Sequence, residues 1–408
     1  MNLDLQRLID RWAGIPLCAA VSGVDALMRR FRPAPANDRA PRAIVVILLS
    51  EMGSLVLAHD MFARLKARYP DAALHALLFR KNREILDLMQ VMDPAHVHTV
   101  DDRSLTSLLS SLGNAIKALR RANVDVAIDC ELFSRISSLL SYASGAGVRV
   151  GFHRHTQEGL YRGSHINRPV PYNPYRHISA QFLTLARAID STAVPKSKLP
   201  LQVSSKPPPQ VQLDDAQVQG IQTRLARDFP AIAGKPLVLV YPSGGILPIR
   251  AWPLASYTAL CEGLVADGCA VAVIGLKDDQ ALARQLVANV HAAFPAGAVI
   301  DLTGYTRSIS ELLALFHVAR LLVTNDGGPG QFAALTPIWT LMLFGPETPG
   351  LYAPLTPHCH SFYSQWPCSP CLTAYNHRRS YCDGDNQCLK VIAPETVLAK
   401  ARECLAAA

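Results

Sequence analysis

The sequence predicts an α/β protein built from two doubly wound domains. Apolar runs of strand length alternate with helix-length segments along most of the chain, as in parallel sheets joined by crossover helices. The chain has 408 residues, more than one ordinary hydrophobic core organises. Half of the residues are hydrophobic and 18% are charged, which is typical of a packed protein. We therefore expect two parallel sheets, each covered by helices.

The first 40 residues precede the first predicted domain. Residues 1–32 carry apolar residues at helical spacing, Pro16 interrupts them, and residues 33–41 form a linker. A basic amphipathic helix with Trp12 can lie on an anionic membrane surface. The alternative is a helix that packs on the protein or on a second subunit. We prefer this alternative because the polar face is not uniformly basic.

Residues 41–194 form the first predicted domain. Strands are expected at 43–49, 73–79, 96–100, 124–128 and 147–152, and helices at 55–69, 84–92, 105–121, 133–142 and 177–189. We expect residues 147–152 to be the last strand. Residues 153–177 lack periodicity and contain eight basic groups, namely His153, Arg154, His155, Arg162, His165, Arg168, Arg176 and His177. A loop of this length is often functional, so it either lines an anionic acceptor site or is a solvated basic loop.

A linker and a connecting helix at residues 195–235 lead to a second predicted domain at 236–408. Its strands are expected at 236–241, 269–274, 299–302, 321–323 and 338–344, and its last helix at 394–404. The carboxyl ends of parallel strands share one edge of a sheet, where ligands bind. Residues that follow these strands are therefore candidate site residues.

A glycine-rich turn follows the strand at 321–323. The strand stops at residues 324–326, which end with Asp326; glycines stand at 327, 328 and 330, and a helix is expected to begin at Gln331. The first N–H groups of a helix lack partners and carry partial positive charge, so this place suits a diphosphate. Asp326 could accept a hydrogen bond from a sugar hydroxyl. The alternative is a tight turn in which Asp326 only caps the helix.

The stretch 324–349 resembles the signature of glycosyltransferase family 9, the ADP-heptose:lipopolysaccharide heptosyltransferases. The matching residues are Asp326, Gly328, Ala333, Ala334, Phe344 and Gly345. Gln331 stands where the family usually has histidine. The resemblance extends from about residue 43 to the end of the chain. It implies a GT-B fold, in which two Rossmann-like domains face each other across a cleft.

The resemblance also implies an activity. It is inverting, metal-independent transfer of a heptose or related sugar from a nucleotide-diphosphate donor, such as ADP-heptose, to a lipopolysaccharide, glycan or protein acceptor. The formal net charge of +8 fits a phosphorylated small molecule or anionic lipid, and no strong nucleic-acid motif is present. Without a membrane-spanning run or a cleavable signal peptide, we expect a cytoplasmic enzyme, including one at the cytoplasmic face of the inner membrane.

Two turns of the second domain are similar to family elements that hold the donor. Ser243 and Gly244 follow the first strand, and Arg250 begins an Arg-Ala-Trp-Pro sequence. The guanidinium fork of Arg250 can donate two parallel hydrogen bonds to an anionic oxygen, with a surface ion pair as the alternative. Asp279 follows a strand as a ribose-binding carboxylate does, or it caps a helix. The residues expected to bind substrate are Gly53, Ser243, Gly244, Asp279, Asp326, Gly327, Gly328 and Gln331.

The catalytic base is less clear from the resemblance. The family has an aspartate directly after the glycine of its first strand–helix turn, where this chain has Ser54 after Gly53. Glu51 lies three residues earlier. We hypothesise that Glu51 is the base, with Ser54 as its hydrogen-bonding neighbour. If Glu51 only caps the helix, the chain is a non-catalytic protein that binds a nucleotide sugar or glycan.

Four of the ten cysteines cluster near the C-terminus. They are Cys368, Cys371, Cys382 and Cys388, and a CxxC pair with two further cysteines resembles a tetrathiolate site for structural zinc or iron. A four-cysteine iron site is a feature of autotransporter-modifying relatives in the family. Four protein ligands leave no open position for catalysis. The alternatives are a disulfide or merely neighbouring thiols.

Overall fold

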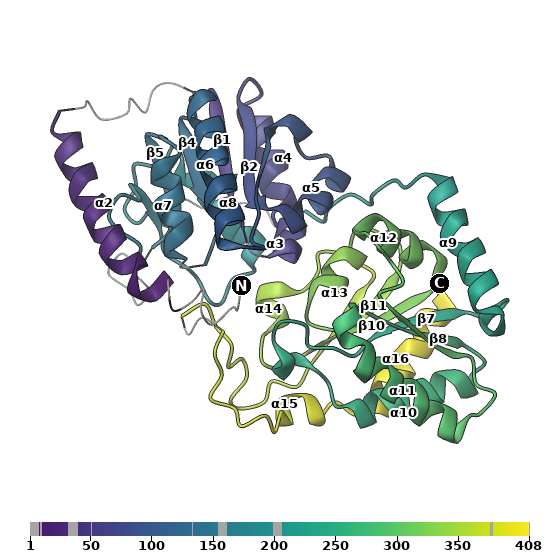
Figure 1. Ribbon diagram of the computed structural model, residues 1–408. Helices are drawn as coiled ribbons and strands as arrows, with labels where there is room; N and C mark the ends of the chain where they lie inside the picture. Colours follow the sequence, from purple (N-terminus) through teal and green to yellow (C-terminus); the bar gives the residue numbers. More distant parts are fainter. Residues whose placement is uncertain are drawn as a thin grey trace. The chain divides into compact units, whose positions relative to one another are not determined.

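The computed structural model describes residues 8, 10–31, 40–49, 51–132, 134–153, 161–198, 206–375 and 378–407. The chain divides into two compact units, residues 1–206 and 207–408 (Figure 1). Each unit contains one six-stranded sheet in which all paired strands are parallel. We refer to them as unit 1 and unit 2.

The sheet of unit 1 has the strand order β3-β2-β1-β4-β5-β6. Its strands are β1 (Ala43–Ile47), β2 (Ala73–Phe79), β3 (Val97–Val100), β4 (Val126–Asp129), β5 (Val148–Phe152) and β6 (Arg168–Val170). Every residue of β1 is buried, as expected of a central parallel strand with helices on both faces. Strand β1 lies inside the sheet, between β2 and β4. The turn that contains Glu51 follows β1 and leads into α3 (Met52–Leu57).

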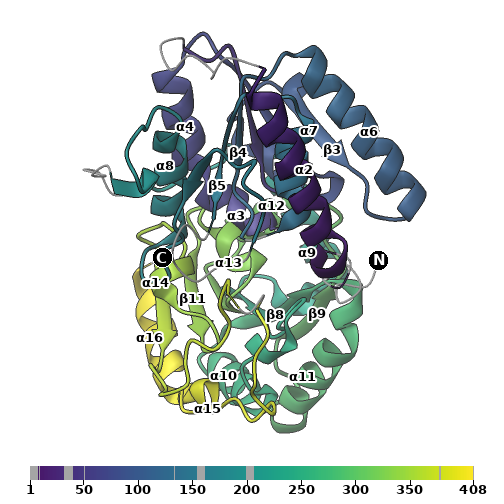
Figure 2. The ribbon, with the colours of Figure 1, turned by 90° about the vertical axis from the view of Figure 1, so that its left-hand side faces the viewer.

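The described helices of unit 1 precede, connect and follow its strands. They are α2 (Gly14–Arg29), α3 (Met52–Leu57), α4 (His59–Arg68), α5 (Arg83–Met89), α6 (Leu105–Arg121), α7 (Arg135–Ala143) and α8 (Ile178–Ala188). Ala115 and Leu119 of α6 pack in a core with Val45 and Ile47 of β1. In Figure 2, α2 lies beside α7, and the two helices are in contact.

The sheet of unit 2 has the order β12-β11-β10-β7-β8-β9. Its strands are β7 (Leu237–Tyr241), β8 (Ala270–Gly275), β9 (Val299–Thr303), β10 (Leu321–Asn325), β11 (Trp339–Phe344) and β12 (Cys359–Tyr363). Strand β10 lies between β7 and β11. The segments that follow these three strands therefore meet at one edge of the sheet.

The helices of unit 2 cover both faces of that sheet. They are α9 (Asp215–Asp228), α10 (Leu254–Ala266), α11 (Gln280–Ala293), α12 (Ile309–Val318), α13 (Gly328–Ala333), α14 (Pro349–Tyr352), α15 (Gln387–Lys390) and α16 (Pro394–Ala407). Trp252 and Tyr257 are buried among the core side chains. The indole N–H of Trp252 donates to the carbonyl of Ile392 at 3.1 Å, which ties the last part of the chain to the site edge.

The structure corrects several sequence expectations. Residues 147–152 are not the last strand of unit 1, because β6 follows inside the predicted basic loop and pairs with β5. This three-residue edge strand contains Pro169, so it carries no usable periodicity. Strand β12 was not expected either. The helix predicted at residues 55–69 is divided at Ala58 into α3 and α4.

The N-terminal helical stretch is divided at Ala13, three residues before Pro16. Pro16 lies in the first turn of α2, where its missing N–H is not needed. Among the described helices, none combines the length and the apolar character needed to cross a bilayer.

Candidate functional site

The carboxyl edge of the unit 2 sheet is organised around Asn325, the last residue of β10. Its side-chain oxygen accepts hydrogen bonds from the backbone N–H of Trp252 at 2.9 Å and the hydroxyl of Tyr257 at 3.0 Å. Its amide nitrogen donates to the carbonyls of Pro242 at 3.1 Å and Ser243 at 3.0 Å. Asn325 is fully buried. It therefore fixes the turn after β7 against the turn after β10. Sequence reasoning missed it, although it stands directly before Asp326 at a strand end.

Four charged side chains meet at the same edge: Arg250, Asp326, Glu347 and Arg378. Arg250 Nη2 lies 2.9 Å from a Glu347 carboxylate oxygen, and Arg250 Nε lies 3.7 Å from Asp326 Oδ2. Arg378 Nε lies 3.2 Å from the second oxygen of Glu347. All four side chains are largely buried. We call these residues the charged cluster.

The protonation of the charged cluster follows from burial and from its neighbours. Burial raises the pKa of Asp326 well above its usual value; Arg250 opposes this and the charge of Glu347 adds to it. Burial also opposes ionisation of Glu347, but Arg378 and Arg250 outweigh it and lower the pKa of Glu347. Asp326 therefore holds the proton and Glu347 the negative charge. With two guanidinium groups and one carboxylate, the charged cluster carries one net positive charge, which favours an anionic ligand.

Sequence reasoning identified Arg250 and Asp326, gave Glu347 no role, and placed Arg378 in the cysteine-containing loop as a residue that could face the acceptor. Glu347 comes three residues after β11, the strand beside β10. An acidic residue at that edge is the signal that could have identified it. Arg378 comes from an irregular segment, so only tertiary packing brings it to the site.

The turn after β7 requires its glycine. A Cβ at Gly244 would lie 2.6 Å from the backbone oxygen of Leu247, so a side chain there would force the backbone apart. The Ser243 hydroxyl accepts a hydrogen bond from the N–H of Gly245 at 3.1 Å. Ser243 thus stabilises the turn that precedes Arg250.

The turn after β10 does not require its first two glycines, because the surrounding atoms leave room for a side chain there. Gly327 is extended, with φ of 173°, and a Cβ on it would approach no atom other than its immediate neighbours closer than 3.9 Å. A Cβ on Gly328 would make ordinary contact with Phe332. The predicted helix is α13, only six residues long. Packing therefore does not require glycine at 327 or 328, and the space beside Asp326 is free of side chains from these two positions.

Gln331 is buried in the first turns of α13. Its amide nitrogen donates to the carbonyl of Tyr352 at 2.7 Å. Its side-chain oxygen is also buried and accepts no hydrogen bond from the part of the chain that the structure describes. Gln331 therefore anchors α14 while keeping one acceptor unused.

Asp279 follows β8 in a short turn. One of its carboxylate oxygens accepts from the N–H of Leu276 at 2.8 Å. This contact is the capping role weighed as the alternative to ribose binding. Asp279 belongs to another strand end of the same sheet.

In unit 1, Glu51 and Ser54 are neighbours as expected. Glu51 directly precedes α3, and the Ser54 hydroxyl donates to the Glu51 carboxylate at 2.8 Å. Ser54 is buried and Glu51 is half-buried. Gly53 lies within the first turn of α3. The geometry brings the hypothesised base and its hydrogen-bonding neighbour together.

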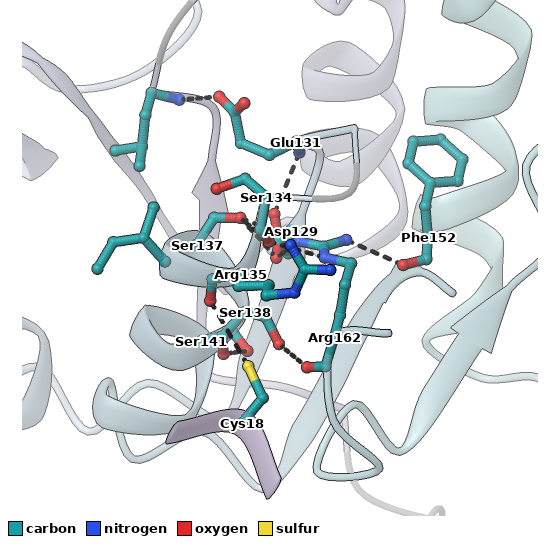
Figure 3. A network of polar contacts seen from close by, with 12 residues as sticks. Cys18, Asp129, Glu131, Ser134, Arg135, Ser137, Ser138, Ser141, Phe152 and Arg162 are labelled. Atoms are coloured by element: carbon teal, nitrogen blue, oxygen red, sulfur yellow. Dashed lines mark hydrogen bonds and ion pairs between the residues drawn. The ribbon is translucent and has the colours of Figure 1, made fainter. Parts of the chain in front are cut away.

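The basic loop of unit 1 is neither wholly solvated nor wholly available to an acceptor. Arg162 is fully buried and forms an ion pair with the fully buried Asp129 (Figure 3). It also donates to the carbonyls of Phe152 at 2.9 Å and Ser134 at 2.8 Å. Both expectations for the loop are thus wrong for Arg162, because its charge neutralises a buried carboxylate at the end of β4.

His165 is fully buried as well. Its ring nitrogens lie 2.9 Å from the Ser138 hydroxyl and 3.2 Å from the Ser22 hydroxyl. Burial lowers the pKa of His165 to about 4. His165 therefore joins α2 to α7 as a neutral side chain. Arg154 and His155 lie outside the described residues.

The four clustered cysteines are not joined in disulfides. Cys388 is buried, Cys371 is half-buried, and Cys368 and Cys382 are exposed. Burial raises the pKa of Cys388 to about 11, and the other three thiols contribute to the rise. The other three thiols therefore lie within electrostatic reach of Cys388.

The cysteines do not form the expected metal site in this structure. Cys371 accepts from the Ser380 hydroxyl at 3.1 Å, and the Cys382 thiol faces the Asn386 side-chain oxygen at 3.5 Å. Within the described ranges, no three His, Cys, Asp or Glu side chains are arranged to hold a metal ion. The predicted tetrathiolate would require the exposed thiols to close toward Cys388.

Comparisons with known proteins agree with this geometry. Residues 113–381 match the family model for glycosyltransferase family 9 (heptosyltransferase). The chain is 25% identical over 316 residues to lipooligosaccharide heptosyltransferase 2 of Haemophilus ducreyi, covering 77% of this chain and 86% of that protein.

Solved structures show the same fold. The ADP-heptose lipopolysaccharide heptosyltransferase II of E. coli aligns with a TM-score of 0.67 at 20% identity, over 90% of this chain and 99% of that one. The iron-containing dodecameric glycosyltransferase TibC of enterotoxigenic E. coli aligns with a TM-score of 0.52 at 13% identity, over 91% of this chain and 80% of that one. These likenesses confirm the predicted GT-B fold class. The match to the family model covers well over half of the chain and includes the charged cluster, so the chain belongs to glycosyltransferase family 9, the heptosyltransferase family, and is a glycosyltransferase.

Proposed function

We propose that this enzyme transfers a heptose from ADP-heptose to a lipopolysaccharide acceptor, with inversion at the anomeric carbon. The observation that carries the proposal is the charged cluster at the carboxyl edge of the unit 2 sheet, in a chain that belongs to the heptosyltransferase family. A net positive charge next to a glycine-rich turn suits a nucleoside diphosphate.

The donor is held by unit 2. Arg250 donates to the diphosphate, and Ser243 and Gly244 shape the turn against which it lies. Asp326 shares its proton with Glu347, so its remaining lone pairs can accept a hydrogen bond from a sugar hydroxyl. Gly327 and Gly328 leave room for the ligand, Gln331 offers its unused acceptor, and Asp279 accepts from the ribose through its second oxygen.

In the chemical step, Glu51 takes the proton from the acceptor hydroxyl. That oxygen forms a bond to the anomeric carbon while the bond from this carbon to the diphosphate oxygen breaks, and ADP leaves with the electron pair. Ser54 orients Glu51 by its hydrogen bond. Arg250 stabilises the negative charge that develops on the leaving diphosphate. Protein groups supply both the base and the charge stabilisation, so no step requires a metal ion.

The acceptor is proposed from the relatives. The relatives named as lipooligosaccharide or lipopolysaccharide heptosyltransferases point to a lipid-linked glycan as the acceptor. Such an acceptor favours an enzyme that acts at the cytoplasmic face of the inner membrane. A protein acceptor is the alternative that the resemblance of the sequence to the family also implies. The two are distinguished by offering heptose-deficient lipopolysaccharide and a folded protein acceptor to the same preparation.

The four cysteines are proposed to hold a structural zinc or iron ion. The support is that the other three thiols lie within electrostatic reach of Cys388, and that the fold is similar to that of TibC, an iron-containing glycosyltransferase. Four thiolates suit both metals. Elemental analysis of the purified enzyme and of a Cys368→Ser/Cys371→Ser variant tests this. We expect one metal per chain in the wild type and none in the variant; a metal-free wild type would contradict the proposal.

The activity is tested by mixing the enzyme with ADP-heptose and heptose-deficient lipopolysaccharide and measuring both ADP release and glycan mass. We expect transfer by the wild type and a loss of at least about a hundredfold in Glu51→Gln, because the amide cannot accept the proton. Glu395→Gln, at an exposed position in α16, is the control and should leave the rate unchanged. Undiminished transfer by Glu51→Gln would reject Glu51 as the base. Tight binding of ADP-heptose without transfer by the wild type would favour a non-catalytic binding protein.

A further inference from the structure

The helix α2 packs on unit 1 with its small and polar residues. Gly14 lies so close to α7 that a Cβ on it would be 2.8 Å from side-chain carbons of Arg135. Four turns of the helix present Gly14, Cys18, Ser22 and Asp25 to the protein, and all four are buried. Ser22 reaches His165, and the Asp25 carboxylate lies 2.7 Å from Arg149 Nη2. The side of α2 that meets the protein is therefore not its apolar side.

The apolar side chains of this segment point outward. The exposed large residues are Leu8, Trp12, Ile15, Leu17, Val24, Leu27, Met28 and Phe31. Leu8, Trp12 and Phe31 flank α2 and the others lie within it, and we call the whole set the outer face of α2. Trp12 is 70% exposed and Phe31 is 78% exposed. In a helix that served only to cover unit 1, these residues would be turned inward. The outer face is an apolar patch of the kind that marks an interaction surface.

The charges of the segment are sorted in the same way. The two acidic side chains within described residues 10–31 turn toward the protein. Asp10 pairs with Arg135 and accepts from the backbone N–H groups at the start of α7, and Asp25 pairs with Arg149. Arg11 and Arg30 are exposed, whereas Arg29, which is also exposed, forms an ion pair with Asp25. The outward side is thus apolar, with Arg11 and Arg30 at its rim, and each of these two carboxylates pairs with a buried arginine.

We propose that the outer face of α2 docks on an anionic lipid bilayer. A helix of 16 residues, about 24 Å long, would lie in the plane of the interface. Its apolar side chains would enter the acyl boundary and its arginines would meet anionic headgroups. A second copy of the chain would bring an identical arginine rim against this one, and like charges would repel. Anionic headgroups neutralise the rim instead, which is why a bilayer fits the surface better. The proposal rests on the proposed function in one respect. A lipid-linked acceptor is the reason for this enzyme to reach a membrane.

The test is co-sedimentation of the full-length protein with phosphatidylcholine vesicles, with and without added phosphatidylglycerol. We expect binding to the anionic vesicles, little binding to phosphatidylcholine alone, and weaker binding at high salt because screening reduces the headgroup attraction. Trp12→Ser/Leu27→Ser/Phe31→Ser should reduce the partition coefficient by at least about tenfold. Arg11→Glu/Arg30→Glu should reduce binding to the anionic vesicles and leave the weak binding to phosphatidylcholine unchanged.

The matched control is Leu105→Ser/Leu109→Ser on α6 of the same unit, where both leucines are 61% exposed; it should bind like the wild type. Failure of the wild type to bind anionic vesicles, or equal loss in the control, would overturn the proposal. The proposal would also be overturned if the wild type formed a dimer and bound no vesicles, and the triple substitution converted that dimer to monomers. A second copy of the chain would then cover the outer face of α2. Binding of ADP by unit 2 is measured in parallel. If ADP binds and vesicles do not, the membrane proposal fails alone; if vesicles bind and ADP does not, the proposed function fails alone.

Discussion

Replacing Glu347 with glutamine tests how the charged cluster shares one proton. Glu347 is 3% exposed and contacts Arg250 at 2.9 Å and Arg378 at 3.2 Å. Each hydrogen bond to a charged group contributes about 1.5–3 kcal/mol, so an uncompensated loss of both would cost about 3–6 kcal/mol. Asp326 supplies the compensation. Once the charge of Glu347 is gone, one reason for the raised pKa of Asp326 disappears, and this carboxyl can ionise beside Arg250.

We therefore expect a moderate loss of folding stability when Glu347 alone is replaced, and a much larger loss when Glu347 and Asp326 are replaced together. Glu347→Gln should lower the free energy of unfolding by about 1–3 kcal/mol. Glu347→Gln/Asp326→Asn, which leaves both arginines without a carboxylate, should lose more than the sum of the two single changes, about 3–5 kcal/mol or more. Urea unfolding followed by tryptophan fluorescence measures both. Asp228→Asn, in an exposed ion pair with Arg227, is the control and should stay within about 0.5 kcal/mol.

The same variant changes the pH dependence of stability. The folded-state pKa of Asp326 is raised, so its stabilising effect is complete below its unfolded pKa of about 3.9 and is lost as pH rises above it. The folded-state pKa of Glu347 is lowered, so its effect is complete above about 4.3 and is lost as pH falls. Glu347→Gln removes the loss of stability at low pH that comes from Glu347, and it weakens the loss at rising pH that comes from Asp326. Additive losses in the double variant, with an unchanged pH profile, would refute the shared proton.

Two further predictions concern buried polar residues, one inside each unit. Asn325→Ala leaves the N–H of Trp252 and the hydroxyl of Tyr257 without their acceptor and should destabilise unit 2 by about 3 kcal/mol or more, whereas Asn289→Ala at an exposed site should have little effect; equal urea midpoints for the two variants would contradict this. His165, whose folded pKa is about 4, stabilises unit 1 above its unfolded pKa of about 6.5, and this contribution is lost as pH falls toward 4 at up to about 1.4 kcal/mol per pH unit. His165→Gln should flatten that acid limb in pH-dependent urea unfolding, and an unchanged slope would show that another group carries it.

The strands were largely predictable from the sequence because buried parallel strands are continuous apolar runs. β2 (Ala73–Phe79) lies at the predicted residues, and α6 (Leu105–Arg121) does as well. β6 was missed because three residues with a proline at a sheet edge leave no pattern. β12, an edge strand of the unit 2 sheet, was missed because its adjacent polar residues His360 and Ser361 interrupt the apolar run.

The site was predictable where chemistry follows a strand end or where the sequence resembles a family element. Asp326 was identified by its position after a strand and Arg250 by its Arg-Ala-Trp-Pro sequence, and the structure brings the two together. Arg378 could not be predicted, because it lies in an irregular segment and reaches Glu347 only through tertiary packing. The buried charge of Arg162 and the neutral state of His165 were also hidden, since neither composition nor spacing shows that a basic loop turns inward.

The sorting of α2 illustrates the same limit. Its apolar and basic residues are visible in the sequence, but their direction is not. The helix packs on unit 1, as preferred from the sequence, yet it does so with its small and acidic residues and leaves the large apolar ones exposed. Packing on the protein and docking on a bilayer are therefore compatible roles of opposite faces.

The most direct test of the account is calorimetric binding of ADP-heptose to the wild type and to Arg250→Met, with Arg227→Met as the control in an exposed ion pair of the same unit. Loss of one charge-assisted contact to the diphosphate should weaken binding by at least about tenfold, while the control binds like the wild type. Equal affinity of Arg250→Met and the wild type would contradict the assignment of the charged cluster as the diphosphate site.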